Sequence, residues 1–148
     1  MMSHHLLLIL HLIAATIWVG GHLLLLCRYL PQALRDRDSS IISNFEKKFE
    51  PIGLPALLIL LLTGVFMAYK YGVTMQSWFS FSNPIERVVS IKLTLLLLTA
   101  VLAVHARLFI IPKLSSKNLI EMAIHILLIS LIGLSMLVVG SSMRFGGI

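Results

Sequence analysis

The stretch HLIAATIWVGGH begins and ends with histidine, His11 and His22, inside the first long apolar run of the chain. Histidine is costly in hydrocarbon, so its presence in a membrane-spanning segment points to a functional site. Eleven residues make three helical turns plus about 20°, which places both rings on one helix face, roughly 16 Å apart along the axis. Trp18 lies on the same stripe, and Gly21 permits close approach by a neighbouring helix or a flat ligand. This face is predicted to pack against protein or a cofactor.

The composition predicts a membrane protein. Of the 148 residues, 58% are hydrophobic and 12% are charged, whereas a soluble domain is nearer half apolar and a quarter charged. The net charge of +6 is assigned to loops that bracket spans, because no nucleic-acid-binding motif is present. Four runs are long enough to cross a bilayer, at residues 6–26, 52–69, 88–111 and 122–143. The expected fold is therefore all-α, a single-domain integral membrane four-helix bundle.

Two further histidines fall near span ends. Because successive spans run in opposite directions, His105 and His125 are expected at the same depth as His22. His11 is expected at an outer level together with Lys92 and Met136. Lys92 and His105 are thirteen residues apart, about 140° out of line, so both cannot face the bundle axis.

Imidazole suits copper, zinc and haem iron, and bundles commonly build such sites from inward-facing residues. The candidate metal ligands are His11, His22, His105, His125 and Met136. Trp18, Gly21 and Lys92 join the four histidines as candidate cofactor-binding residues. The alternative is that the histidines only hydrogen-bond neighbouring helices as packing groups. The spacing does not select the metal, and copper and haem b both remain open.

The segment between the first two spans, residues 28–51, is the one long loop on the expected cytoplasmic side. Ser43-Asn44-Phe45-Glu46 has the spacing of a capping box, and apolar residues follow at helical intervals. The pattern predicts a short amphipathic helix on the inner membrane surface, leading into span two through Pro51 and Pro55.

The N-terminus begins Met1-Met2-Ser3-His4-His5 and is rich in soft donors. Thioethers favour the cuprous ion, and three more methionines are expected on the same side, at Met67, Met75 and Met143. These groups could collect copper on the outer side, although methionine is also an ordinary filler of gaps between helices.

Several short motifs resemble the copper resistance protein D family. They are the first-span pattern from His11 to Gly21, Phe49-Glu-Pro-Ile-Gly-Leu, Leu62-Thr63-Gly64, and in span three Lys92-Leu, Ala106-Arg107 and Pro112-Lys113-Leu114. The resemblance implies a bacterial inner-membrane, multi-pass protein that moves copper toward the cytoplasm or confers copper tolerance. The pattern of His11, Trp18, Gly21 and Lys92 is also similar to four-helix protoporphyrinogen oxidases, which bind haem. Their Tyr-Leu-Pro-Arg element and their second histidine are spaced differently from Tyr29-Leu30-Pro31 and His105.

The leading interpretation is binding or transport of copper across the membrane through intramembrane histidines. One alternative is a b-type haem protein that transfers electrons across the bilayer or oxidises a lipophilic or porphyrinogen substrate, and whether the chain is an enzyme stays open. Another is a non-catalytic membrane assembly subunit. The expected partners are the bilayer and a metal ion or haem, with a homo-oligomer or a periplasmic copper-carrying protein left open.

The basic residues predict the orientation of the chain. Eight lie in or beside the loops after spans one and three: Arg28, Arg35, Arg37, Lys47, Lys48, Arg107, Lys113 and Lys117. Four lie toward the other side: Lys70, Arg87, Lys92 and Arg144. The positive-inside rule therefore puts both termini on the periplasmic side. A reporter active only in the cytoplasm is expected to work when fused within residues 35–48 and to fail at the C-terminus. The reverse pattern of activity would invert the orientation of every site.

Overall fold

The computed structural model describes residues 4–148, and within them the structure is all-α, as expected. Four long helices carry the fold: α1 (His4–Leu24), α3 (Ser40–Lys70), α4 (Pro84–His105) and α5 (Leu119–Ser142). With their helical extensions, the described part of the chain holds four segments long and apolar enough to cross a membrane. They are His4–Asp36, Ser40–Lys70, Pro84–Lys113 and Leu119–Phe145.

Shorter elements extend or join these helices. A π-helical segment, η1 (Leu25–Tyr29), links α1 to α2 (Leu30–Asp36), and a second one, η3 (Ala106–Ile110), continues α4. Three single 3₁₀ turns are η2 (Met75–Ser77), η4 (Ile111–Lys113) and η5 (Met143–Phe145). Short π segments inside helices occur often at functional sites. Here η1 begins three residues after His22 and η3 begins directly after His105.

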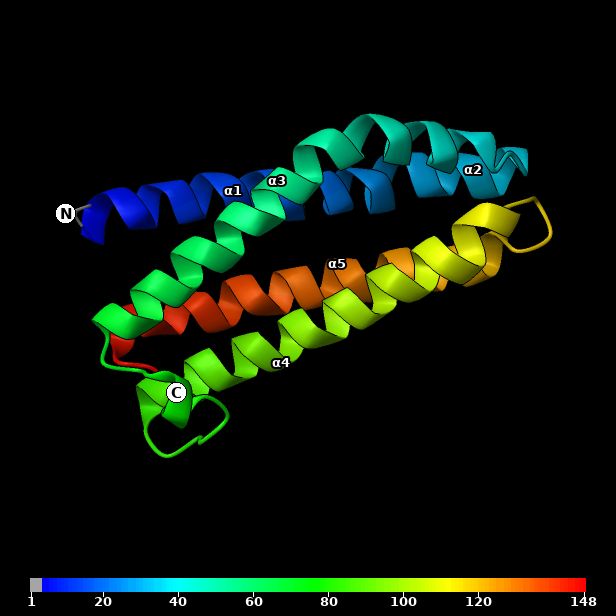
Figure 1. Cartoon of the computed structure of the whole chain (residues 1–148). Helices are drawn as coiled ribbons and strands as arrows, with labels where there is room; N and C mark the ends of the chain where they lie inside the picture. The colour runs from blue at the N-terminus through cyan, green and yellow to red at the C-terminus, as the bar shows by residue number, and fades with distance from the viewer. Residues whose placement is uncertain (1–3) are drawn as a thin grey trace.

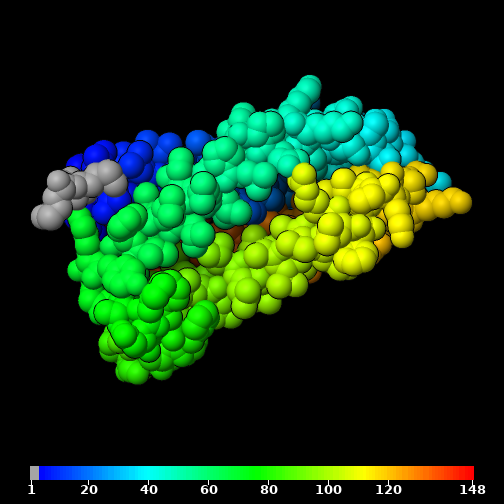
Figure 2. All heavy atoms as spheres, in the orientation of Figure 1, coloured from blue at the N-terminus to red at the C-terminus, as the bar shows by residue number. Residues whose placement is uncertain are grey.

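The four long helices form a bundle that is open along one side. Helix α1 packs mainly on α3, α4 packs on α5, and α1 also contacts α5, whereas α3 and α4 share only isolated contacts. Figure 1 shows the start of α1 and the end of α5 at one end of the bundle, opposite the α2–α3 turn and the α4–α5 connection. In Figure 2, atoms of α1 (blue) and α5 (orange) are visible between α3 (teal) and α4 (yellow-green).

Helix α3 differs from the sequence expectation. A separate amphipathic helix was expected before span two, but the chain is one continuous helix from Ser40 to Lys70, with Pro51 and Pro55 inside it. A proline removes a backbone donor and bends a helix without ending it when the flanking turns are stabilised by packing, and α3 curves in this region in Figure 1. The predicted capping-box residues therefore lie inside the first turns of α3.

The start of α3 is fixed three residues earlier than the predicted cap. Arg37 adopts a left-handed conformation (φ 52°) that ends α2. The carboxylate of Asp38 then accepts a hydrogen bond from the Ser40 amide at 2.9 Å. Hydrogen bonds from the Ser40 side chain and amide hold the pKa of the Asp38 carboxyl below its usual value. The charged carboxylate thus caps the first turn, where helix N–H groups lack partners.

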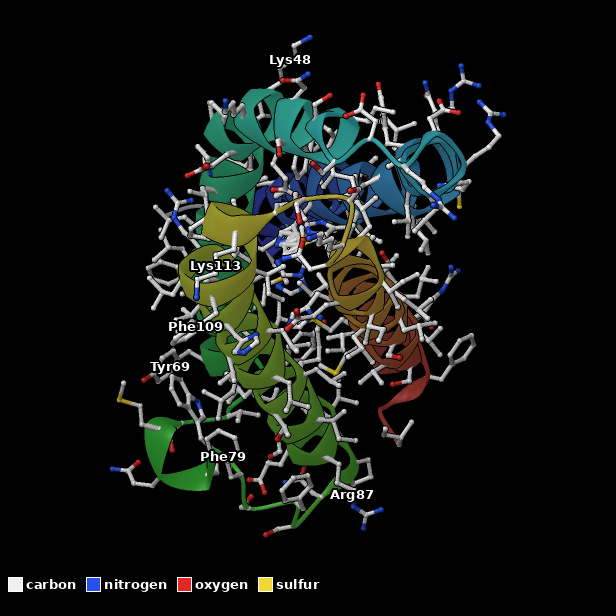
Figure 3. The ribbon with its side chains drawn as sticks, turned by 90° about the vertical axis from the view of Figure 1, so that its right-hand side faces the viewer. Lys48, Tyr69, Phe79, Arg87, Phe109 and Lys113 are labelled. Atoms are coloured by element: carbon white, nitrogen blue, oxygen red, sulfur yellow. The ribbon has the colours of Figure 1, made fainter. Side chains whose placement is uncertain are left out.

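The buried core lies at the end of the bundle where η1, α2, η3 and the starts of α3 and α5 meet. Its buried members are Leu25, Leu30, Ala33, Ile42, Ala106, Ile110, Leu119, Met122 and Ile126. Both π segments supply residues to this core. Lys48, on the same end, extends away from the bundle in Figure 3. One end of the bundle is therefore tightly packed, and the spans run from it with their apolar outer faces exposed, as membrane helices require.

The contact between α1 and α3 depends on glycine. A Cβ atom at Gly21 would lie 2.2 Å from the ring of Phe49, and one at Gly53 would lie 2.7 Å from the same ring. The ring is thus held against two backbone segments and has little room to move. A Cβ at Gly20 would meet nothing within 4 Å. The close approach predicted for Gly21 is made by a protein side chain, Phe49.

These two glycines give a matched pair of variants. Gly21→Leu is expected to lower the free energy of unfolding by at least about 2 kcal/mol, because the new side chain overlaps the Phe49 ring. Gly20→Leu is expected to change it little, because leucine there enters open space and favours the helix. Thermal unfolding of both variants in the same detergent measures the difference. Equal stability would show that Phe49 does not pack against Gly21.

Candidate functional site

His11 of α1 is tied to α3 by a hydrogen bond. Its Nδ1 lies 2.8 Å from the hydroxyl oxygen of Thr63. That hydroxyl donates its own hydrogen to the Ile59 carbonyl at 2.6 Å, so Thr63 accepts from His11 Nδ1–H. The hydrogen-bond network therefore assigns the proton of the neutral ring to Nδ1. Nε2 keeps its lone pair for a ligand.

Lys92 of α4 lies in the same part of the bundle. A Cβ at Gly140 of α5 would be 3.1 Å from its Nζ atom, so the ammonium group rests on the glycine backbone. It is also close enough to His11 to repel a positive charge on that ring. Within residues 4–148, the group has no hydrogen-bond or ion-pair partner. Of the two residues that could not both face the bundle axis, Lys92 is half-buried and His105 is exposed.

His22 is surrounded by aromatic rings. Its Nδ1–H donates to the Trp18 carbonyl at 2.8 Å, and its ring stacks on Trp18 at a centroid distance of 3.7 Å. The His22 ring also lies edge-on to Phe49, with a centroid distance of 5.7 Å and an angle of 85° between the ring planes. The Ser130 hydroxyl of α5 donates to the Ile126 carbonyl of its own helix at 2.7 Å, and its oxygen lies 3.3 Å from the His22 backbone carbonyl. As at His11, the bond at Nδ1 leaves Nε2 of the neutral ring as a free lone pair.

His105 and His125 form a pair. Nδ1 of His105 lies 3.0 Å from Nε2 of His125, and the ring planes differ by 9°. His125 Nδ1–H donates to the Glu121 carbonyl at 3.0 Å, so in neutral rings His125 Nε2 accepts from His105 Nδ1–H. The two rings are thus joined by one N–H···N hydrogen bond between His105 Nδ1 and His125 Nε2. The remaining lone pair lies on Nε2 of His105.

Contacts along α5 place the histidines at three levels. His11 and Lys92 are level with Gly140, His22 with Ser130, and His105 with His125. At about 1.5 Å per residue, the His11 level is roughly 15 Å from the His22 level, and the His22 level is roughly 7 Å from the level of His105 and His125.

Met136 lies on α5 between the His11 level and the His22 level. Gly133, three residues before it, approaches Val19 of α1, and Gly140, four residues after it, approaches Lys92 of α4. Residues at this spacing share a helix face. The half-buried Met136 therefore sits on the side of α5 that meets the other helices.

The structure brings some predicted residues together and separates others. His105 pairs with His125, Trp18 with His22, and His11 with Lys92. His22 was expected to join His105 and His125, but among residues 4–148 no three His, Cys, Asp or Glu side chains group closely enough to hold a metal ion. Of the expected outer copper-collecting groups, Met1 and Met2 lie outside the described residues, whereas the ring of His4 packs edge-on against Tyr71.

Sequence reasoning missed two residues that shape the site. Thr63 was noted only as part of a motif, although its hydroxyl sets the proton position on His11. Phe49 was assigned to a surface helix, although it contacts Gly21, Gly53 and His22. A threonine directly before a glycine within an apolar span was the available signal for the first. The contacts of Phe49 could not be predicted without knowing that α3 is one continuous helix.

The fold and these residues define a four-span helical membrane protein with histidines inside its spans. A family model, copper resistance protein D, matches residues 43–143. Because this match covers more than half of the chain, the protein belongs to the copper resistance protein D family. No curated protein and no solved structure matches the chain. The membership links this membrane protein to copper resistance.

The proton positions assigned above can be measured by ¹⁵N NMR of histidine-labelled protein. His11 and His22 are expected to show the pattern of a protonated Nδ1 and a bare Nε2. Thr63→Val removes the acceptor and is expected to shift the His11 signals toward the ordinary mixture of tautomers, leaving His22 unchanged. Thr99→Val is the matched control, because Thr99 is buried and bonds only its own helix, at Leu95. A His11 spectrum unaffected by Thr63→Val would contradict the assignment.

Proposed function

We propose that this protein binds copper within the membrane and passes it between histidine levels. The observation that carries the proposal is the orientation of His11 and His22, whose Nδ1–H groups are bonded to oxygen atoms and whose Nε2 atoms are left available. Histidines that bind metals nearly always donate their other N–H to such an acceptor, which fixes the ring and raises its basicity. Membership of a copper resistance family supports copper as the metal.

The histidine and methionine donors suit a transported copper ion better than a permanently bound one. Structural metal sites are closed by three or four protein ligands, and no such group exists among residues 4–148. Imidazole and thioether together suit copper, with thioethers favouring the cuprous ion. An ion that must move on has to be held well enough to enter and weakly enough to leave. Levels that offer only one or two donors each would bind copper weakly enough to release it.

The pair of His105 and His125 offers a two-nitrogen level. The two nitrogens are 3.0 Å apart with a proton between them. With metal–nitrogen bonds of about 2 Å, a linear two-coordinate ion would need them about 4 Å apart. His105 is exposed, so its ring can move outward by that amount. Copper arriving there would take the place of the shared proton, which would move to Nε2 of His105 as that ring changes tautomer.

The proposed path follows the predicted orientation in the bacterial inner membrane. Copper, delivered by a periplasmic copper-carrying protein, enters at the end that carries His4 and Met75. It passes His11, Met136 and His22 in turn and reaches the histidine pair near the basic, cytoplasmic end. The direction rests on the eight-to-four split of basic residues. The order of the levels rests on their contacts along α5.

Copper content of single variants tests the proposal. His22→Ala and His11→Ala are each expected to lose the ion of one level and keep the other. His105→Ala and His125→Ala are expected to cause the same loss as each other, because either removes half of the pair. Thr63→Val is expected to weaken copper binding at His11 by roughly 10–100-fold. Metal analysis of purified protein, loaded with cuprous ion, is the measurement.

Folding is checked in parallel by thermal unfolding, and Ser135→Ala is the control. Ser135 is exposed on α5 and bonds only its own helix, at Leu131, so copper content should not change. Undiminished copper in all four histidine variants would mean that the rings are packing groups. A Soret band that disappears in His22→Ala would replace copper with haem as the ligand.

A further inference from the structure

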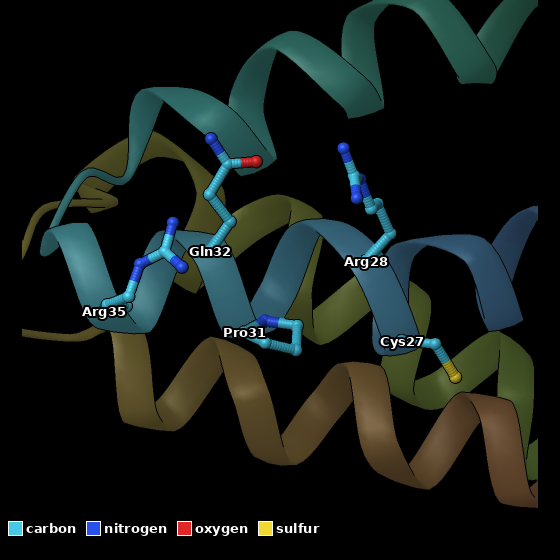
Figure 4. Close-up of a pocket in the computed structure, with 5 residues that line it drawn as sticks. All are labelled: Cys27, Arg28, Pro31, Gln32 and Arg35. Atoms are coloured by element: carbon cyan, nitrogen blue, oxygen red, sulfur yellow. The ribbon is translucent and has the colours of Figure 1, made fainter.

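A second polar site lies on the outer surface of η1 and α2. A pocket of about 420 Å³ is lined by Cys27, Arg28, Pro31, Gln32 and Arg35. Figure 4 shows Arg28, Gln32 and Arg35 extending from the same side of the helix, as expected for positions four and three residues apart. None of these residues belongs to the histidine levels. The pocket lies where the first span reaches the tightly packed end of the bundle.

The polar groups of this pocket are short of partners. Arg28 has no ion pair or hydrogen bond to another residue of the described chain, and the same holds for the Gln32 amide. Arg35 is held by the neighbouring carboxylate of Asp36 at 3.0 Å, with its guanidinium still largely exposed. Two guanidinium groups and one amide therefore present several N–H donors on one side of the same helical segment. No acidic residue lines it.

The donors fit one class of ligand. Guanidinium groups bind phosphate oxygens through paired, charge-assisted hydrogen bonds. A pocket of this volume has room for a phosphate group and its small alcohol substituent. Apolar side chains are exposed on either side along the helix, with Leu24 51% and Leu34 36% exposed. A ligand with a phosphate head and an apolar tail would cover both kinds of surface.

We propose that the pocket of Arg28, Gln32 and Arg35 binds the phosphate headgroup of an anionic membrane phospholipid. The headgroup phosphate lies between the two guanidinium groups and accepts from the Gln32 amide. The acyl chains run along the leucines of the first span. Occupancy fixes the junction of α1 and α2 at the membrane surface. The site is independent of the proposed copper function.

The chain carries its own reporter for this pocket. Cys27 is the single cysteine of the sequence and is exposed at the edge of the pocket. The full-length protein is placed in nanodiscs of phosphatidylcholine with or without phosphatidylglycerol. Alkylation of Cys27 by uncharged N-ethylmaleimide is then timed. An uncharged reagent is not repelled by the surface charge of the anionic lipid.

Phosphatidylglycerol is expected to slow alkylation at least fivefold in the wild-type protein. Native mass spectrometry is expected to show retained phosphatidylglycerol, bound about tenfold more weakly after loss of the two arginine contacts. The double variant Arg28→Gln with Arg35→Gln should therefore lose both effects. Arg37→Gln, which removes one positive charge close by but outside the pocket, should keep both, whereas Arg35→Gln, which removes one charge inside it, should weaken both.

Three results would overturn the proposal. An equal loss in Arg37→Gln would reduce the effect to general surface charge. Protection and retention unchanged in the double variant would show that the arginines do not hold the lipid. Equal protection by millimolar inorganic phosphate, in uncharged detergent without lipid, would assign the pocket to a free phosphate and reject the lipid.

Discussion

Inside hydrocarbon, a polar group must find its hydrogen-bond partner within the protein, and this requirement governs the arrangement of the intramembrane histidines. His11 donates to a hydroxyl on α3, while His22 and His125 donate to carbonyls one turn back in their own helices. Each bond uses Nδ1. Satisfying the N–H at Nδ1 also fixes the orientation of each ring, and at His11 and His22 it leaves Nε2 with its lone pair, as the proposed copper binding requires.

The shape of the bundle gives these rings a route to their surroundings. The packed end holds η1, α2 and η3 together with α5, and α1 and α3 are joined through Phe49 and two glycines. Helices α3 and α4 lack such a seam, although the side chains of Glu50 and Arg107 form an ion pair between the two sides. Both partners are substantially exposed, and exposed ion pairs stabilise little. This ion pair therefore adds little to the contact between α3 and α4.

Much of the architecture follows from the sequence, because bilayer thickness sets span length and apolar runs reveal it. The shared face of His11, Trp18 and His22 follows equally from helix periodicity. The continuity of α3 did not follow, because Pro51 and Pro55 are helix breakers by local rules. In the structure, Phe49 packs against Gly21 of α1 just before the two prolines, a tertiary contact that local rules do not see. The π segments also leave no simple sequence signal. Depth estimates from the sequence placed His22 with His105 and His125, whereas in the structure His22 contacts α5 at Ser130, five residues beyond His125.

The separation of the levels bears on how copper could cross. Roughly 15 Å between the His11 and His22 levels is too far for direct transfer between ligands whose metal bonds are about 2 Å long. Met136 stands between them on the inward side of α5, and its flexible thioether is a suitable intermediate donor. The unpaired ammonium of Lys92 near His11 has the opposite effect, because it repels a cation held at that ring. In the proposed path, a site that attracts through one lone pair and repels through a neighbouring charge would hold copper briefly, which is what passage to the next donor would require.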